Sequence, residues 1–528
     1  MNEHGLSTRP WSPNNPAART VRLLGHLRTI GSMTTFSDAL VRADGRLVLA
    51  ELVPWAGTIQ DQAGDRLRSE ARDLAADRRV TAITITDNAG GHVRLGPLTL
   101  GHAIHDMGGE VLVHVACRER NRASLESLAY GLASEGLTNV LALSGDFPKD
   151  GYHGRSRPVF DIDSVGLLSL LRDASAHGLH FTTGAAVNPF KALESDLVPQ
   201  LLKLAFKVRA GASFAICQVG WDARSLHELI RWSEAQRLGI PLIAPVYILS
   251  RGVARVFSRD EIPGIRLSAD LLAMVEAAAE SPDKGRGRFL ELAAMQIAVA
   301  RGLGYAGVYV AGQRDAAEMD RVLTMADGYA PDDWRGMLAE VSYPEPGAHR
   351  LFEPGDVPQL ASDRPARPLK RPGAPLFYRF NRLVHDHVFD PDSKGFSAAR
   401  SVYGRLESMH LAKPAHVLEQ MAKIPMYGCK DCGDCSLPDI AYQCPEGACA
   451  KNQRNGPCGG SLNGECEVPG KPCVWTNAYD RLKPYGEALT MLDREPVLQD
   501  NALRGTSAWA NTFLGRDHYR HQGKGGDS

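Results

Sequence analysis

Residues Leu197–Val219 read LVPQLLKLAFKVRAGASFAICQV, and this stretch contains the unit from which the fold is built. Apolar residues three and four positions apart over Leu197–Arg209 predict an amphipathic helix. Gly211 stands where a helix commonly ends in a left-handed residue. The apolar run Ser213–Val219 then predicts a buried strand. A helix that leads through a glycine into a buried strand is typical of an α/β protein.

The same unit recurs through the first 330 residues. Helical periodicity is also present over Ser124–Ala133, Val165–Ala176, Ser225–Gln236 and Glu291–Ala300, and the first three are followed by Gly136, Gly178 and Gly239. The eight predicted strands are Leu47–Glu51, Val80–Thr86, Glu110–Ala116, Thr138–Leu143, Leu179–Thr183, Ser213–Val219, Ile240–Val246 and Tyr305–Ala311. Eight strands alternating with helices over roughly 280 residues predict a (β/α)₈ TIM barrel. An open doubly wound sheet is the alternative, although no Gly-x-Gly-x-x-Gly follows the first strand.

The composition is that of an ordinary globular chain. Its 528 residues are 44% hydrophobic and 23% charged, with a formal net charge of -1. No apolar run reaches the ~18 residues that cross a bilayer, and no signal peptide pattern opens the chain. We therefore expect a cytoplasmic protein without a membrane or nucleic-acid partner, although a small anionic ligand is compatible with the charge balance.

Changes in composition along the chain predict five parts. Residues 1–35 form a flexible N-terminal arm, 36–330 the barrel and 331–375 a proline-rich linker or surface wrap. Residues 376–490 form a cysteine-rich metal-binding domain that contains eight of the ten cysteines, and 491–528 form a tail expected to be disordered after Gly515.

Polar residues gather at the carboxyl ends of the predicted strands, where a barrel of this kind forms its active site. They are Glu51, Thr84, Asp87, Asn88, His114, the run Ser144-Gly145-Asp146, and Gln218. Any one of them is as often a structural residue as a functional one. Their joint occurrence at one end of the barrel predicts a site.

The cysteines follow the spacing Cys429-x₂-Cys432-x₂-Cys435-x₈-Cys444-Pro, and Cys449, Cys458, Cys466 and Cys473 come after them. Three cysteines at x₂ intervals with a later Cys-Pro are similar in kind to the ligand run of bacterial ferredoxins. Zinc sites more often pair two C-x₂-C knuckles. The spacing favours at least one [4Fe-4S] cluster, with zinc or structural thiols as the alternatives.

Four segments of the barrel resemble motifs of the methylenetetrahydrofolate reductases. The segments are Glu51-Leu-Val-Pro54, Val113-His114-Val-Ala-Cys117, Asn139 to Pro148 (NVLALSGDFP), and Ala210 to Gln218 (AGASFAICQ) with Lys207 before it. The resemblance spans Leu47 to Gly328 at low identity, with the motifs in the same order and at the same spacing.

The resemblance implies a role for each matched residue. Glu51 would be the general acid that opens the methylene bridge of the folate, Asp146 would meet flavin and pterin, and Gln218 would bind the pterin. Thr84, His114, Asn188 and Lys207 match positions that hold the flavin, FAD or FMN, and its phosphates. Electrons would come from NAD(P)H or another carrier.

Four departures from the family pattern concern the flavin site. Ser144 stands where the family usually has Arg, Gly184 where it has Tyr, and Gln200 where it has Asp. Asn188 likewise replaces a His. Each lost contact is typically worth ~1 kcal/mol, so the pattern predicts weaker flavin binding and leaves a reductase without bound flavin open.

The cysteine segment resembles the C-terminal domain of some bacterial methylenetetrahydrofolate reductases, and it is similar to the iron-sulfur partner subunit of the acetogen enzymes. The matching parts are Asn455 to Gly460 (NGPCGG), Gly464 to Val468 (GECEV) and Cys473-Val-Trp475. This resemblance implies a cluster that either relays electrons to the flavin or braces the barrel.

Together these resemblances predict an oxidoreductase that interconverts 5,10-methylenetetrahydrofolate and 5-methyltetrahydrofolate, in a direction the sequence does not encode. A folate-dependent methyltransferase with zinc in the cysteine module is one alternative. A non-catalytic electron-transfer adaptor is the other. The expected partners are a folate, a redox protein and further copies of the chain in a homo-oligomer.

Overall fold

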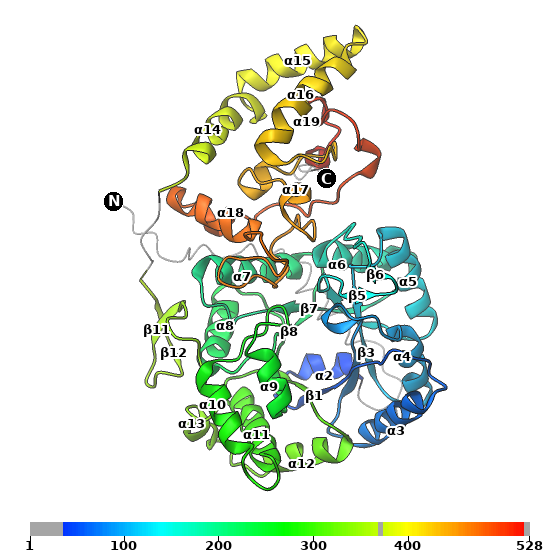
Figure 1. Ribbon diagram of the computed structural model, residues 1–528, viewed down its shortest axis with the longest axis vertical. Coiled ribbons are helices and arrows are strands. Elements are labelled where there is room, and N and C mark those ends of the chain that lie inside the picture. The colour runs from blue at the N-terminus through cyan, green and yellow to red at the C-terminus, as the bar shows by residue number, and fades with distance from the viewer. Residues whose placement is uncertain (1–34, 368–372, 522–528) are drawn as a thin grey trace.

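The computed structural model describes residues 35–367 and 373–521, which form a closed barrel of eight parallel strands and a helical, cysteine-rich region above it (Figure 1). The barrel strands are β1 Leu47–Leu52, β2 Ala82–Ile85, β3 Val111–Ala116, β4 Asn139–Leu143, β7 Thr182–Val187, β8 Phe214–Cys217, β9 Leu242–Tyr247 and β10 Gly307–Ala311. They pair in chain order and β10 returns to β1, where Leu47 lies beside Gly307. The predicted (β/α)₈ barrel is confirmed.

Helices follow the strands and cover the barrel from outside. They are α3 Gln62–Ala76, α4 Pro97–Asp106, α5 Arg122–Ser134, α6 Ser164–Asp173, α7 Glu194–Arg209, α8 Ala223–Ala235, α9 Arg251–Phe257, α10 Ala269–Ala278, α11 Arg286–Gly302 and α12 Ala316–Asp327. Gly178 and Gly239 have φ of 77° and 65°, which is the left-handed conformation expected after a helix. The short helix α2 Phe36–Arg42 packs against the amino-terminal ends of the barrel strands, where Phe36 meets Phe214 edge to face at 5.2 Å.

The fifth predicted strand differs from the structure. The sequence placed it at Leu179–Thr183, whereas β7 covers Thr182–Val187. A Cβ atom on Gly184 would lie 2.2 Å from the ring of Phe214. Because the ring of Phe214 on the neighbouring strand β8 fills the space beside Gly184, only a small residue fits there on β7. A run of Gly and Ala lacks the composition typical of a strand, so the sequence pattern does not extend the strand through it.

Residues after the barrel wrap its side before they reach the cysteine-rich region. This stretch includes α13 Trp334–Met337 and a hairpin of β11 Phe352–Pro354 and β12 Ala361–Pro365. Arg224 of α8 donates to the carbonyl of Phe352 at 2.8 Å. A second small hairpin, β5 Asp150–Gly151 and β6 Gly154–Arg155, follows β4. Of the predicted N-terminal arm, all but residue 35 lies outside the described residues.

The cysteine-rich region is mainly helical. Its helices are α14 Leu376–Val384, α15 Lys394–Ser408, α16 Ala412–Tyr427, α17 Pro445–Ala448, α18 Val474–Leu482 and α19 Ala508–Phe513, with a π-helical turn at His385–Phe389. Tail residues that the sequence separated from this region pack into it, because His518 is buried and its ring lies 3.1 Å from the Asp439 carboxylate. The domain boundaries stay predictions. Within the described residues, no helix is both long and apolar enough to span a membrane.

Candidate functional site at the barrel mouth

Glu51 lies at the carboxyl end of β1, inside the mouth of the barrel. Its carboxylate accepts a hydrogen bond of 2.6 Å from the phenol of Tyr309 in β10, and Gln313 Nε2 donates to its backbone carbonyl at 2.5 Å. Burial raises the pKa of the Glu51 carboxyl, while the Tyr309 hydrogen bond opposes part of that rise. The side chain therefore keeps its proton to a higher pH than an exposed glutamic acid, as a general acid requires.

Thr84 and His114 stand beside Glu51 on the next two strands. Thr84 is the register partner of Glu51 and is fully buried, with its hydroxyl 3.5 Å from the carbonyl of Ala50. The His114 ring centroid lies 6.1 Å from that of Tyr309. Burial lowers the pKa of His114 to about 4, and its Nε2 atom has no hydrogen-bond partner within the described chain. A buried neutral imidazole with one free ring nitrogen is a position for a ligand atom or a water.

Asp146 lies in the loop after β4. The backbone N–H of Gly90 donates to its Oδ2 at 3.0 Å, and Arg118 donates to its backbone carbonyl at 3.0 Å. Arg118 is almost completely buried and also donates to the carbonyl of Asn88 at 3.2 Å. One buried guanidinium thus fixes the loops that follow β2 and β4 against each other.

Gln218 and Asn188 lie on the opposite side of the mouth. Asn188 Nδ2 donates to the carbonyl of Gly264 at 2.7 Å, and Gln218 Oε1 accepts from the N–H of Val219 at 2.9 Å. A Cβ on Gly264 would lie 3.3 Å from Asn188 Nδ2, 3.5 Å from Gln218 Nε2 and 2.9 Å from the carbonyl oxygen of Gly459. Both predicted site residues therefore lie beside Gly264, which also approaches the cysteine-rich region at Gly459.

Three buried lysines line the same side. Lys207 Nζ donates to the carbonyl of Ala186 at 2.6 Å. Burial, together with the nearby charge of Lys203, lowers the pKa of Lys207 to about 7. Lys191 Nζ donates to the carbonyl of Gly459 at 2.8 Å. The ammonium groups of this cluster are thus already held by acceptors of the chain itself.

Residues 451–467 of the cysteine-rich region cover the ends of β4 and β7. Lys203 Nζ donates to Gln453 Oε1 and to the carbonyl of Gly456, both at 3.0 Å, and Ser144 Oγ donates to Gln453 Oε1 at 3.1 Å. A Cβ on Gly459 would lie 3.7 Å from Gln200 Oε1. Two departures from the reductase pattern, Ser144 and Gln200, are thus in contact with this chain's own C-terminal region.

A buried ion pair joins the cysteine-rich region to the Asp146 loop. Lys451 Nζ lies 2.7 Å from Glu467 Oε1, and both side chains are about 4% exposed. Lys451 also donates to the carbonyl of Gly145 at 2.8 Å, and Glu467 accepts from the N–H of Phe147 at 2.8 Å. The residues on both sides of Asp146 are therefore positioned by the cysteine-rich region.

Four of the eight cysteines surround one cavity. They are Cys429, Cys432, Cys435 and Cys444, and the cations Lys423 and Arg454 are among the other lining residues. The N–H of Asp431 donates to Cys429 Sγ at 3.5 Å, and that of Gly447 donates to Cys444 Sγ at 3.4 Å. Lys423 Nζ lies 3.5 Å from Cys435 Sγ. Donors directed at sulfur stabilise ligating thiolates.

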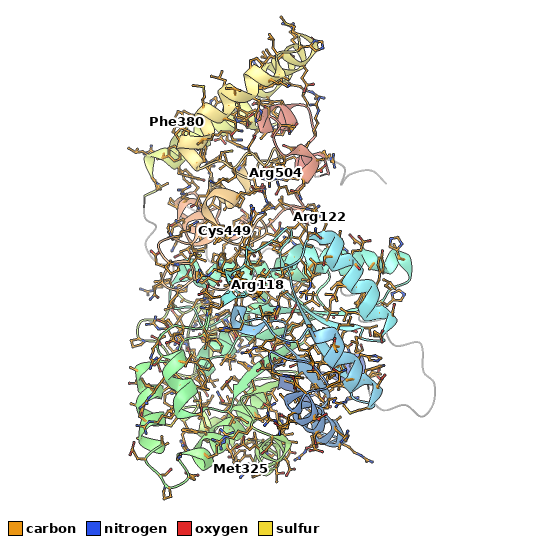
Figure 2. The ribbon with its side chains drawn as sticks, turned by 45° about the vertical axis from the view of Figure 1, so that its right-hand side comes forward. Arg118, Arg122, Met325, Phe380, Cys449 and Arg504 are labelled. Carbon is orange, nitrogen blue, oxygen red and sulfur yellow. The ribbon has the colours of Figure 1, made fainter. Side chains whose placement is uncertain are left out.

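Of the other four cysteines, Cys458 and Cys466 lie within residues 451–467, Cys449 just before them and Cys473 just after them. Burial raises the pKa of the Cys449, Cys466 and Cys473 thiols, and the charge of Cys458 adds to the rise in each. The N–H of Gly460 donates to Cys458 Sγ at 3.4 Å. Figure 2 shows Cys449 where the cysteine-rich region meets the barrel.

Both cysteine sets fit iron-sulfur clusters in their chemistry. Each combines four thiols with N–H donors to sulfur, as cluster ligands require. In the part of the chain that the structure describes, no three His, Cys, Asp or Glu side chains converge as ligands of a single metal ion would. A four-iron cluster binds its four thiolates on different iron atoms, so its ligands stand apart.

The sequence did not single out Tyr309, Lys451 or Glu467. Tyr309 lies in a strand that was predicted, and its place at the mouth follows from the alternation of side chains between the two faces of a strand. Lys451 follows Cys449 closely, and Glu467 lies within the matched segment Gly464 to Val468, but neither carries a functional signal of its own, so only the contact between the two regions reveals them.

Two family models match the chain. Residues 61–302 match the model described as Methylenetetrahydrofolate reductase, and residues 410–500 match the one described as Methylene-tetrahydrofolate reductase C terminal. Curated relatives include the 5,10-methylenetetrahydrofolate reductases of Pectobacterium carotovorum and Salmonella typhimurium, each 29% identical over 119 residues. The match covers 22% of this chain and 37% of each relative.

Solved structures with a similar arrangement are more distant. An uncharacterized protein from Clostridium thermocellum that binds two copies of 5-methyl-5,6,7,8-tetrahydrofolic acid is 10% identical, with a TM-score of 0.39 over 54% of this chain and 95% of that one. Tryptophan synthase from M. tuberculosis is 15% identical, with a TM-score of 0.30 over 54% and 92%. The family models carry the assignment: the barrel belongs to the methylenetetrahydrofolate reductase family, and the cysteine-rich region is a methylene-tetrahydrofolate reductase C-terminal domain.

Proposed function

We propose that the protein is an oxidoreductase that interconverts 5,10-methylenetetrahydrofolate and 5-methyltetrahydrofolate. The observation that carries this proposal is the buried Glu51 carboxyl, hydrogen-bonded by Tyr309 at the mouth of a barrel of this family. In the reductive direction Glu51 gives a proton to the folate nitrogen that leaves the methylene carbon, and that carbon accepts a hydride. In the oxidative direction the carboxylate takes the proton back.

Gln218 and Asp146 are proposed to bind the pterin. Their amide and carboxylate groups match the donors and acceptors of a pterin edge, and buried polar contacts of this kind give a site its specificity. The loop that carries Asp146 is fixed by Arg118 on one side and by the Lys451–Glu467 pair on the other. The carboxylate thus sits in a preorganised loop, which lowers the cost of orienting the substrate.

The mouth fits a flavin on one side and not on the other. On the first side His114 Nε2 has no hydrogen-bond partner within the described residues, whereas Thr84 is fully buried and Asp146 accepts from Gly90. Lys207 and Asn188, the other predicted contacts, already have partners in the chain. When bound, a flavin supplies the hydride chemistry that amino acids lack, with NAD(P)H or another carrier as the electron source. We propose a flavin, FAD or FMN, held by few contacts and therefore readily lost.

The two cysteine sets are proposed to hold [4Fe-4S] clusters, one set per cluster. Cys429, Cys432, Cys435 and Cys444 would bind one, and Cys449, Cys458, Cys466 and Cys473 the other. The contact of the second set's segment with Ser144 and Lys203 supports a relay of electrons between a redox partner and the mouth. The same contacts would brace the barrel.

The test is an assay of the anaerobically purified full chain. We expect about eight iron atoms per chain and oxidation of 5-methyltetrahydrofolate by an artificial dye after flavin is supplied. Glu51→Gln should lower kcat by about 10²–10⁴-fold while folate still binds, whereas Glu280→Gln, on an exposed side chain, should not.

Three outcomes would count against the proposal. Zinc without iron, together with methyl transfer to a thiol, would indicate a methyltransferase. Full activity of Glu51→Gln in electron transfer would indicate an adaptor that performs no folate chemistry. A chain loaded with iron and flavin that turns over no folate would exclude the reductase assignment altogether.

A further inference from the structure

An unusually apolar surface covers the far end of the cysteine-rich region. Of the 22 exposed large hydrophobic residues in the described chain, twelve lie within residues 376–426 on α14–α16 and the turns beside them. They are Leu376, Phe377, Phe380, Leu383, Val402, Met409, Leu411, Val417, Leu418, Met421, Ile424 and Met426, which are 40% to 79% exposed. We call them the helical apolar surface. Figure 2 shows Phe380 at the outer edge of the region, away from the barrel.

The helix α14 carries aromatic or aliphatic side chains on two opposite faces, of which only the inner one is buried. Tyr378 and Asn381 are buried on the inner face, where the Tyr378 ring packs on Tyr442 and Tyr485 with centroids 5.5 and 5.6 Å apart. Leu376, Phe380 and Leu383 follow at intervals of four and three on the opposite face. A surface helix of a monomer normally carries polar residues on that face.

The helix α16 repeats this arrangement. Its inner face contains Glu419 and Lys423, which pair at 2.9 Å beside the first cysteine cavity. Val417, Met421 and Ile424 lie on the outer face, again at intervals of four and three, with Leu418 beside them. The spacing is that of a helix which packs along another helix. Phe377 and Tyr427 join α14 to α16, with ring centroids 5.7 Å apart.

The size of the helical apolar surface indicates a permanent partner. Its residues expose roughly 1,000 Å² of apolar area, whereas the largest apolar patch of a typical monomer is about 300–600 Å². A stable interface buries about 800 Å² on each side, and transient redox complexes bury less than about 1,200 Å² in total. Homodimer interfaces are also the more apolar class. Area and composition thus favour an obligate interface over the docking of an electron carrier.

The exposed charges of residues 376–426 have both signs. The cations are Arg379, Lys394, Arg400, Arg405 and Lys413, and the anions are Asp386 and Asp392. A surface with both signs can pair with itself about a two-fold axis where a cation of one copy meets an anion of the other.

We propose that the helical apolar surface is a homodimer interface, in which α14 and α16 of one copy pack on the same helices of a second copy. The two chains are related by a two-fold axis, so the contact closes and forms no filament. Each dimer then has its two barrels at opposite ends and the two Cys429–Cys444 sites toward its centre. This inference does not depend on the reaction proposed above.

The test is the mass of the full-length, anaerobically purified chain in solution, measured by sedimentation velocity and light scattering. We expect a particle of twice the chain mass of 57.3 kDa. The double variant Leu418→Glu, Met421→Glu and the separate variant Phe380→Glu should each raise the dimer dissociation constant at least ~100-fold. Val93→Glu, at a 67% exposed residue of the barrel, is the matched control and should stay dimeric.

Because all the substituted side chains are exposed in one copy, the variants should retain the iron content and circular dichroism of the wild type. A wild-type chain that is monomeric at micromolar concentration would overturn the proposal, even if it pairs with another protein. A dimer that survives both variants, or an open-ended assembly, would also overturn it.

Discussion

At the scale of single residues, the site depends on how Tyr309 acts on Glu51. The phenol donates a hydrogen bond to the carboxylate and so stabilises its charged form against burial. Tyr309→Phe removes that donor, and the pKa of Glu51 should therefore rise further. If Glu51 acts as the acid in folate reduction, the alkaline limb of the pH–rate profile should move to higher pH. An unchanged limb would show that another group limits the rate at high pH.

Lys207 gives a second residue-scale prediction. Its pKa falls from 10.5 to about 7 on folding, so between these values the unfolded chain binds a proton that the folded chain releases. Stability should then rise with pH across this window, by at most about 1.4 kcal/mol per pH unit. Lys207→Met should abolish this rise in urea unfolding at pH 7.5 and 9.5. Lys413→Met, at an exposed lysine, is the control and should retain it.

The sequence predicted Glu51, Thr84, His114, Asp146 and Gln218 as mouth residues because strand ends converge in a closed barrel. Their roles stay predictions. The partners of Lys191, Lys203 and Lys207 could not be predicted, since a buried ammonium takes any acceptor that the fold brings to it.

At the scale of elements, β7 and β8 fit each other through one small and one large residue. A Cβ on Gly184 would lie 2.2 Å from the Phe214 ring. Gly184→Ala should therefore lower the free energy of unfolding by about 1–3 kcal/mol. Adding Phe214→Leu should recover part of that loss, measured as a double-mutant cycle in urea. Additive losses would mean that the two side chains do not compete for the same space.

Most elements were predictable because hydrophobic periodicity is local. The predicted helices agree with α5, α6, α7, α8 and α11, and all eight strands are present. The strand β7 was placed too early, since Gly184-Ala-Ala lacks the branched residues by which a strand is recognised. The burial of His518 was not foreseen, because its partners Asp434 and Asp439 lie about 80 residues earlier in the chain.

At the scale of the whole molecule, the Lys451–Glu467 pair joins the two regions. Lys451→Met leaves the Glu467 carboxylate buried beside Phe147 and should cost about 3–5 kcal/mol in urea unfolding. The double variant with Glu467→Gln should cost less. Arg288→Met, which breaks the exposed pair with Glu340, should cost at most ~1 kcal/mol. Equal losses for Lys451→Met and Arg288→Met would show that the pair does not hold the regions together.

The covering of the barrel mouth could not be read from the sequence. The motifs identified each region separately, but their contact joins residues some 300 positions apart, such as Ser144 and Gln453. The departures at Ser144 and Gln200 looked like losses of flavin contacts. In the structure these side chains lie against the cysteine-rich region.

The position of residues 451–467 also decides how molecules reach the barrel. The ends of β4 and β7 lie under that segment, so the proposed folate substrate would have to approach from the side of β1, β2 and β10, where Glu51, Thr84 and Tyr309 stand. Under the proposed function, the substrate and product would then pass on one side of the mouth, and the covered side would separate them from the thiol ligands.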